Sequence, residues 1–363
     1  MRAPCRRGST CRGGVVRPSP AMVLVVACGD SCASSSRSPH HYHRTPVRFW
    51  QVPCYVVWFA WVMASRRSRP SRRPQVALPT DPIRTAYQTV RVAADRDHDR
   101  RLTLFLDDTP SSFIDLDDPL HVGFEYLDIM HRVIVDLAPT SRKIAHLGVA
   151  GASLARACAA SIPAVEQIGI DIDGELLELV RRWFDLPRSP ALKLRPGDAL
   201  EQVVSLRSGS IDVLTRDIFT AGVIPEHVVS STMAGEVMRV LRPGGLYLVN
   251  SADRQPLTLV KRELATLAHS IAQTHQLNAS EVSSSWDPWD YLALIAEPSI
   301  VKKKRYGNVV LCAVRPDAEN PMSPFETSET LYRSLRSMAV PASILHGEQI
   351  QHFVADAQPF GPS

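Results

Sequence analysis

Cysteine is scarce over most of this 363-residue chain. Five of the seven cysteines lie in residues 1–75, which leaves only Cys158 and Cys312 in the other 288 residues. Both lie in apolar segments, the usual surroundings of a structural free thiol. A disulfide framework is thus excluded for this part, and the sequence predicts a reducing, cytoplasmic location.

Long apolar runs are also missing. The longest candidate, Val56–Ala64 (VVWFAWVMA), has nine residues, whereas a membrane-spanning helix needs about 20. The basic stretch SRRSRPSRR follows it in place of a small-residue cleavage site. The sequence therefore predicts no membrane partner.

Residues 1–75 have no lysine and almost no acidic residue. They hold thirteen arginines and one acid, Asp30, and so carry a net charge of +12, which leaves −8 for the rest of the chain. We expect a disordered arm, or an extension of the gene model. Such an arm would bind phosphates by charge alone. Nothing else in the sequence supports a nucleic-acid partner, so we do not expect one. No histidines and cysteines stand at paired metal-ligand spacing, so no metal is predicted.

Strands and helices alternate regularly after the arm. In residues 76–122, a linker leads to two strands (RLTLFLDD and SSFIDLDD) with a turn predicted at Thr109–Pro110, which gives a β-hairpin subdomain. The alternation over residues 123–316 predicts an α/β fold with a doubly wound, mostly parallel sheet. Its last two strands have no helix between them, which predicts an antiparallel strand at one edge. Residues 317–363 are predicted to be a helical extension.

The segment KIAHLGVAGASLARACAA (Lys143–Ala160) is typical of a nucleotide-binding βαβ unit. A short apolar strand leads into a glycine turn and then into a helix. Gly148 allows a sharp turn, and Gly151 allows a ligand to approach the backbone at the helix start. This pattern serves NAD, FAD and S-adenosylmethionine, and it also occurs in α/β proteins that bind nothing there.

Two acidic residues at later strand ends bear on the ligand. Asp171 ends the second strand (IGIDIDGEL), where a carboxylate accepts hydrogen bonds from ribose hydroxyls. A helix cap is the alternative there, and it suits Asp173 better. Asp198 and Ala199 end the third strand (LRPGDALE) and are expected to lie against the adenine amino group. Asp198 is equally well explained as the cap of the following helix.

The residue at position 150 separates two classes of cofactor. A dehydrogenase usually has glycine there because the backbone faces a pyrophosphate, but this chain has Ala150. S-adenosylmethionine has no phosphate. The later segments IDVLTRDIF and VMRVLRPGGLYLV follow in the order typical of class I S-adenosylmethionine-dependent methyltransferases. We therefore expect S-adenosylmethionine or its decarboxylated form as the cofactor.

Within that superfamily, the chain resembles the spermidine synthase (polyamine aminopropyltransferase) family. The resemblance lies in LTLFLDDTPSSFIDLDD, FEYLDIM and the core Ile144–Val314, and it covers about residues 101–357. It implies a Rossmann-like, seven-stranded sheet with an N-terminal β-hairpin subdomain. It also implies a small amine or polyamine substrate and a homodimer.

The resemblance also assigns roles to individual residues. Asp217 occupies the family's catalytic aspartate position, Tyr126 matches the tyrosine that orients the attacking nitrogen, and Asp128 falls where a carboxylate often lies. Glu226 and His227 follow in the loop after Asp217 and are expected to line the substrate pocket. Structural alternatives remain open: a packing role for Tyr126, a loop cap for Asp217 and a favourable charge at a helix start for Glu226.

Three positions depart from the family pattern. Thr220 replaces a second aspartate, Ser111 replaces a glutamine of the hairpin, and Asp108 replaces a glycine. A charge-assisted hydrogen bond is worth about 1.5–3 kcal/mol, so the lost carboxylate weakens the case for putrescine as acceptor. Two alternatives to aminopropyl transfer stay open: methyl transfer to a small nucleophile, and a catalytically inactive cofactor-binding module.

Overall fold

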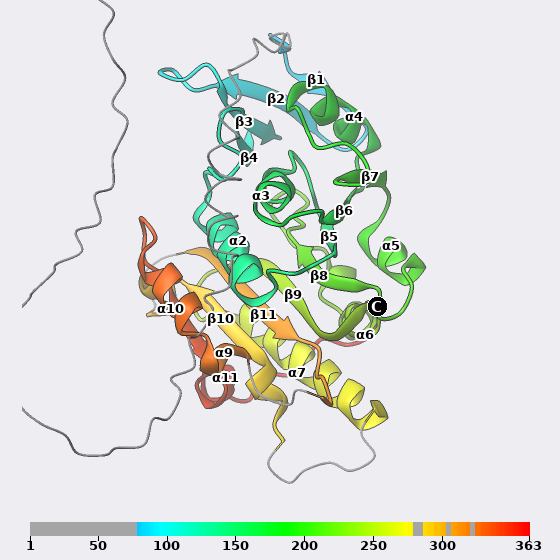
Figure 1. Ribbon diagram of the computed structural model, residues 1–363, viewed down its shortest axis with the longest axis vertical. Coiled ribbons are helices and arrows are strands. Elements are labelled where there is room, and N and C mark those ends of the chain that lie inside the picture. The colour runs from blue at the N-terminus through cyan, green and yellow to red at the C-terminus, as the bar shows by residue number, and fades with distance from the viewer. Residues whose placement is uncertain (1–77, 279–285, 303–305, 320–323) are drawn as a thin grey trace, which may run out of the picture. The chain divides into compact units, whose positions relative to one another are not determined.

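Two β-sheets organise the part of the chain that the structure describes (Figure 1). This computed structural model describes residues 78–278, 286–302, 306–319 and 324–363. All of them belong to the second of the chain's two structural units, Arg72–Ser363. The predicted arm, residues 1–75, lies outside the described residues.

The N-terminal sheet is antiparallel, in the order β1-β2-β3-β4. Its strands are β1 (Ile83–Arg84), β2 (Thr89–Ala94), β3 (Arg101–Leu106) and β4 (Thr109–Asp115). The hairpin turns at Asp107 and Asp108, and the predicted turn residues Thr109 and Pro110 instead begin β4. Both aspartates have positive φ, 46° and 63°, which two-residue hairpin turns require and aspartate tolerates.

The second sheet has eight strands in the order β12-β10-β11-β9-β8-β5-β6-β7. They are β5 (Lys143–Leu147), β6 (Glu166–Asp171), β7 (Lys193–Pro196), β8 (Ile211–Arg216), β9 (Leu241–Asp253), β10 (Leu292–Ala296), β11 (Gly307–Val314) and β12 (Ser343–His346). The five strands from β5 to β9 pair in parallel. The predicted α/β class with a mostly parallel sheet is thus confirmed.

Two details of this sheet differ from the sequence prediction. The sequence predicted one antiparallel strand at an edge of the sheet. Strand β11 is antiparallel, but it lies between β9 and β10 and not at the edge. Residues 309–314 of β11 are all buried, which an edge position would not allow. Strand β12 extends the expected seven strands to eight, and it comes from the segment 317–363, which was predicted to be helical.

Helices cover both faces of the large sheet (Figure 1). α2 packs against α3 in one layer, and α5, α6 and α7 form a continuous layer on the other face. The helices are α2 (Glu125–Leu137), α3 (Ser153–Ser161), α4 (Gly174–Trp183), α5 (Ala199–Ser205), α6 (Ser231–Val240), α7 (Thr258–Asn278), α8 (Pro298–Val301), α9 (Pro324–Thr327), α10 (Glu329–Arg336) and α11 (Glu348–Val354). Two 3₁₀ turns are η1 (Glu226–Val228) and η2 (Pro288–Tyr291).

The segment from Glu226 to Leu241 has a helical sequence pattern throughout, which predicts one helix, but the structure divides it in two. The Ser230 hydroxyl accepts a hydrogen bond from the Met233 amide at 3.2 Å, so α6 begins only after Ser230. The residues before it form the single turn η1. The division matters for function because it turns His227 out of a regular helix and toward the carboxyl end of the sheet.

Asp173 joins the N-terminal sheet to the main domain. Its buried carboxylate caps α4 by accepting from the Leu176 amide at 3.0 Å. It also accepts from the Thr85 hydroxyl at 2.6 Å and from the Gln88 side-chain amide at 3.1 Å. A buried carboxylate is stable only with such partners. These hydrogen bonds therefore attach the N-terminal sheet to the start of α4.

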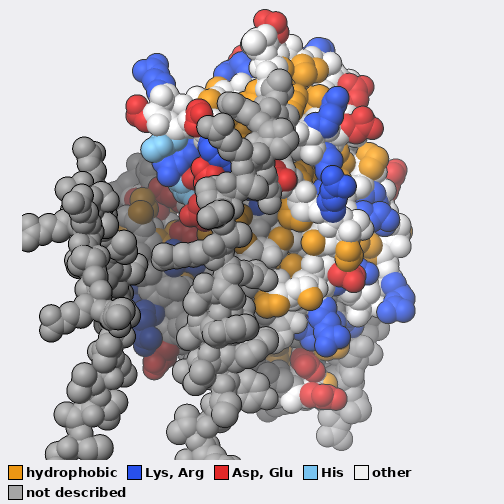
Figure 2. Space-filling view, turned by 45° about the horizontal axis from the view of Figure 1, so that its top comes forward, with side chains coloured by type: hydrophobic (Ala, Val, Ile, Leu, Met, Phe, Trp, Pro, Cys, Tyr) orange, Lys and Arg blue, Asp and Glu red, His pale blue; other side chains and the backbone are white. Residues whose placement is uncertain are grey.

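Acidic and basic side chains are interspersed on the face of the molecule in Figure 2. Among the described residues, no helix has both the length and the apolar character that crossing a bilayer would require.

A histidine is buried in the middle of the parallel sheet. His146 on β5 contacts the Thr215 hydroxyl on β8 at 2.9 Å and the Gln167 side-chain oxygen on β6 at 2.9 Å. The Gln167 amide donates in turn to the Ala155 and Ala191 carbonyls. Burial lowers the pKa of His146 to about 4, and the Gln167 hydrogen bond opposes this only partly, so the ring is neutral in the folded protein at pH 7.

We expect His146 to make folding stability fall between pH 7 and pH 5. The unfolded histidine has a pKa near 6.5 and binds a proton in this range, whereas the folded one does not until about pH 4. Stability is therefore full above pH 6.5 and is lost as the pH falls toward 4, by about 2 kcal/mol at pH 5. Urea unfolding at both pH values should show a smaller loss for His146→Gln. His352→Gln, at an exposed position, is the control, and an unchanged loss in His146→Gln contradicts the prediction.

Candidate active site

Three carboxylates gather where neighbouring parallel strands end. Asp171 is the last residue of β6, Asp198 follows β7, and Asp217 follows β8. Strand β5 lies between β6 and β8 and leads into the glycine turn that begins at Gly148. The carboxyl edge of an open parallel sheet is where such folds bind ligands.

Gly148 lets the turn lie directly against the end of β8. Its φ is +76°, and a Cβ atom placed there would lie 2.2 Å from the Asp217 carbonyl oxygen. The Asp217 amide in turn donates to the Leu147 carbonyl at 2.9 Å. Any side chain at position 148 would push the turn and Asp217 apart, so the close approach depends on glycine.

Asp171 is held by the backbone of the same turn. Its two oxygens accept hydrogen bonds from the Ala150 amide at 3.0 Å and the Asp173 amide at 3.1 Å. Burial raises the Asp171 pKa, while these amide bonds act in the opposite direction. The Ile172 amide is a third backbone donor to this carboxylate, which has about four lone-pair sites, so one remains for a ligand. Ile172 follows and is 48% exposed. It was not predicted as a site residue, although an apolar residue between two acids at a strand end was a usable signal.

Asp198 has two partners of different kinds. One oxygen accepts from the Leu200 and Glu201 amides at 2.9 and 3.1 Å and so caps α5. The other accepts from His227 Nε2 at 2.9 Å. Asp198 is therefore a helix cap, as the structural alternative predicted. Its second oxygen still points to the loop after β8. Ala199 is the first residue of α5 and is buried.

Asp217 lies at the centre of a cluster drawn from three elements. The Tyr126 hydroxyl on α2 donates to Asp217 Oδ2 at 2.8 Å, and Asn250 Nδ2 on β9 donates to Oδ1 at 2.9 Å. Burial raises the Asp217 pKa, while the hydrogen bonds from Asn250 and Tyr126 and the nearby Arg216 charge lower it, with a net rise. Burial, followed by the Asp217 charge, raises the Tyr126 pKa, so its hydroxyl stays protonated and donates. Asn250 was missed, although it is a polar residue at the end of an apolar strand.

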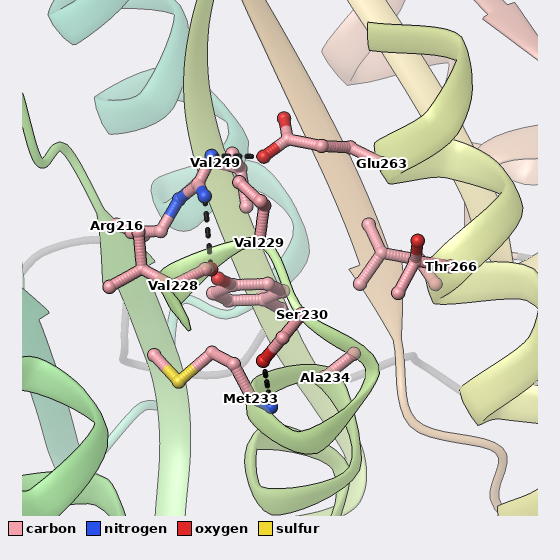
Figure 3. Close-up of a pocket in the computed structure, with 11 residues that line it drawn as sticks. Arg216, Val228, Val229, Ser230, Met233, Ala234, Val249, Glu263 and Thr266 are labelled. Atoms are coloured by element: carbon pink, nitrogen blue, oxygen red, sulfur yellow. Dashed lines mark hydrogen bonds and ion pairs between the residues drawn. The ribbon is translucent and has the colours of Figure 1, made fainter. Parts of the chain in front are cut away.

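A buried ion pair anchors the end of β8 from the opposite side (Figure 3). Arg216 Nη2 lies 2.6 Å from Glu263 Oε1 on α7, and Nη1 donates to the Val228 carbonyl of η1 at 3.1 Å. The side chains of Arg216 and Glu263 are only 1% and 5% exposed. Together with Ser230 and other residues they line a small pocket behind the site. This pair fixes both the strand that carries Asp217 and the turn that carries His227.

The hairpin rests on the glycine turn through Ser112. The Gly151 amide donates to the Ser112 hydroxyl at 3.0 Å, and a Cβ atom at Gly151 would lie 2.7 Å from Ser112 Cβ. The Ser111 hydroxyl instead donates to the Thr109 carbonyl within the hairpin, and the Asp108 side chain is exposed. A register shift in the hairpin between Leu104 and Phe105 accompanies this arrangement.

The remaining predicted substrate residues do not join the cluster. Asp128 lies two residues after Tyr126 and therefore on a different side of α2, away from the cluster. It pairs with Arg132 at 3.0 Å. Glu226 is exposed on η1, and the exposed Thr220 forms backbone hydrogen bonds with Val223. Their substrate roles stay predictions. No group of three histidine, cysteine or acidic side chains suited to a metal ion occurs among the described residues.

Comparison with known proteins points to one family. No protein-family model matches the chain. The curated polyamine aminopropyltransferase of Chromobacterium violaceum is 25% identical over 160 residues, which are 43% of this chain and 60% of that protein. The enzyme of the same name from Neisseria meningitidis serogroup A is 24% identical over 161 residues, 44% of this chain and 61% of the relative. This chain thus spans about three fifths of the length of the curated relatives it matches.

A solved structure extends the similarity over most of the chain. The probable spermidine synthase from Corynebacterium glutamicum superposes with a TM-score of 0.67 and is 26% identical. The match covers 79% of this chain and 98% of the other. The resemblance to the spermidine synthase-like family is therefore confirmed in sequence and in fold.

The Tyr126 hydroxyl should hold down the pKa of Asp217. A hydrogen bond to the charged form of a carboxylate favours that form, so Tyr126→Phe should raise the Asp217 pKa further. The carboxyl ¹³C signal of Asp217, assigned by its loss in Asp217→Asn, should titrate at higher pH in the phenylalanine variant. Tyr306→Phe, at an exposed position, is the matched control. An unchanged titration would show that the bond does not stabilise the carboxylate.

Proposed function

We propose that this chain, a spermidine synthase-like protein by sequence and fold, transfers an aminopropyl group from decarboxylated S-adenosylmethionine to a small amine. The observation that carries the proposal is the Asp217 carboxylate, held by Tyr126 and Asn250 at the carboxyl end of β8. The names of the curated relatives and of the structural neighbour support the same reaction.

The residues around the glycine turn fit an adenosyl group. Asp171 offers a remaining lone pair for a ribose hydroxyl, Ile172 offers an exposed apolar surface for a purine, and Asp198 offers a carboxylate oxygen for an amino group. Ala150 stands where a pyrophosphate would need glycine. When bound, the decarboxylated cofactor would supply a sulfonium-linked aminopropyl chain for transfer.

Asp217 is suited to act as the base. An amine with a pKa near that of lysine, about 10.4, must lose a proton before its nitrogen can attack. Burial raises the Asp217 pKa and makes the carboxylate a better acceptor. Asp217 takes the proton, the nitrogen lone pair forms the new C–N bond, and the electron pair of the C–S bond stays on sulfur.

The other two members of the cluster position this base. Tyr126 and Asn250 each hold one oxygen of Asp217, so the carboxylate cannot rotate freely. Arg216 and Glu263 fix the strand end behind it. Since Asp171, Asp198 and Asp217 all lie at this edge, the site also favours cationic ligands over anionic ones.

Replacement of the base should remove turnover and leave cofactor binding largely intact. We expect Asp217→Asn to lower turnover by about 10²- to 10⁴-fold, the usual contribution of a general base. Mass spectrometry of the nucleoside product, with a panel of amines, should detect methylthioadenosine with the decarboxylated cofactor. Asp356→Asn, an exposed aspartate, is the control. In a parallel reaction with S-adenosylmethionine, S-adenosylhomocysteine as product would indicate methyl transfer. No product with either compound despite cofactor binding would indicate a binding module.

Thr220 should limit the affinity for a second ammonium group. The side chain is exposed, so solvent screens any charge placed there, and a restored carboxylate should contribute about 1 kcal/mol, or about fivefold in affinity. Thr220→Asp should therefore lower the KM for diamines about fivefold and leave the KM for monoamines unchanged. Thr220→Asn controls for size. Equal effects on both amine classes would contradict a charge-specific contact.

A further inference from the structure

The contact between His227 and Asp198 uses the part of Asp198 that a ligand would need. Asp198 Oδ1 is occupied by two amides of α5, which also fix the carboxylate in place. Oδ2 is the oxygen left for other donors, and His227 Nε2 lies 2.9 Å from it. The side chains of His227 and Asp198 are 39% and 28% exposed, so a ligand can reach the pair.

The backbone of His227 is anchored by hydrogen bonds, whereas its side chain is 39% exposed. The His227 carbonyl accepts from the Ser230 hydroxyl at 2.8 Å, and the next carbonyl, that of Val228, accepts from the buried Arg216 at 3.1 Å. Asp198 is the hydrogen-bond partner that the structure shows for the imidazole. Rotation of this one side chain would uncover Oδ2 and leave η1 in place.

An amino group on a purine is the same kind of donor as the imidazole N–H. Both present a single N–H to a carboxylate oxygen, and the carboxylate cannot turn to offer another because α5 holds it. His227 comes from the turn after β8, at the carboxyl edge where a ligand beside Ile172 would also lie. The two donors therefore compete for one position.

We propose that His227 is a gate on the adenosyl site, whose imidazole occupies Asp198 Oδ2 until the 6-amino group of the ligand replaces it. The inference rests on the proposed function, because it takes the adenosyl ligand from there. It gives His227 a role in setting the affinity for the adenosyl ligand in place of a contact with the amine substrate. A purine without a 6-amino group leaves the imidazole in place, so the gate lowers the affinity for adenine ligands and not for such purines.

The test is direct binding of methylthioadenosine by titration calorimetry. Loss of a competing hydrogen bond of ordinary strength should make His227→Ala bind about two- to tenfold more tightly than the wild type. His227→Gln keeps an N–H donor and should return the affinity toward the wild-type value. His352→Ala is the control at an exposed histidine elsewhere. The analogue that lacks the 6-amino group should bind the wild type and His227→Ala equally.

The outcomes separate the gate from the proposed function. If His227→Ala binds methylthioadenosine with equal or lower affinity than the wild type, His227 does not compete and the gate is overturned. If it gains affinity equally for the analogue without the amino group, the gain does not arise at Asp198 and the gate is again overturned. If neither the wild type nor any variant binds an adenosyl compound, the proposed function fails and the gate with it. Tighter binding without transfer activity would support the gate and overturn the proposed chemistry.

Discussion

The site depends on the contact between the backbone of Gly148 and the backbone of Asp217. With no side chain at position 148, the turn after β5 lies against the residue that follows β8, and the two strand ends share one edge. This contact brings the catalytic candidate next to the turn that holds Asp171 through the Ala150 amide. A methyl group at position 148 would separate these parts by more than hydrogen bonds tolerate.

Around that contact, buried charges are kept in place by partners on both sides of the sheet. Asp217 is held by Tyr126 and Asn250 on one side, and the preceding residue, Arg216, is held by Glu263 on the other. Successive residues at a strand end point to opposite faces of the sheet. Asp217 therefore faces the site, while Arg216 next to it forms the buried ion pair that fixes the end of β8. Breaking a buried pair of this kind is costly, since it leaves an uncompensated charge. The geometry of Asp217 is therefore tied to the stability of the domain.

Much of this arrangement follows from local sequence patterns, and the remainder depends on contacts between distant segments. The strand ends at Asp171 and Asp217 and the turn at Gly148 were predictable, because parallel strands bring such residues to one edge. The contacts of Asn250 and Ser112 were not predictable, because these residues reach the site from segments 33 and 39 residues away from their partners, although the polar character of Asn250 was a signal. The break before α6 was missed because residues 226–241 keep a helical pattern, and only the cap at Ser230 ends the turn η1.

The bond between Ser112 and Gly151 changes what the glycine turn can offer. In nucleotide-binding folds of this type, backbone amides at the start of the helix bind a phosphate. Here the Gly151 amide already binds a hydroxyl of the protein's own hairpin. The Ser112 hydroxyl thus occupies the position that a phosphate oxygen occupies in dinucleotide-binding proteins. The glycine turn here connects the hairpin to the large sheet. The groups that remain available at this edge are carboxylates, which accept hydrogen bonds and favour positive charge.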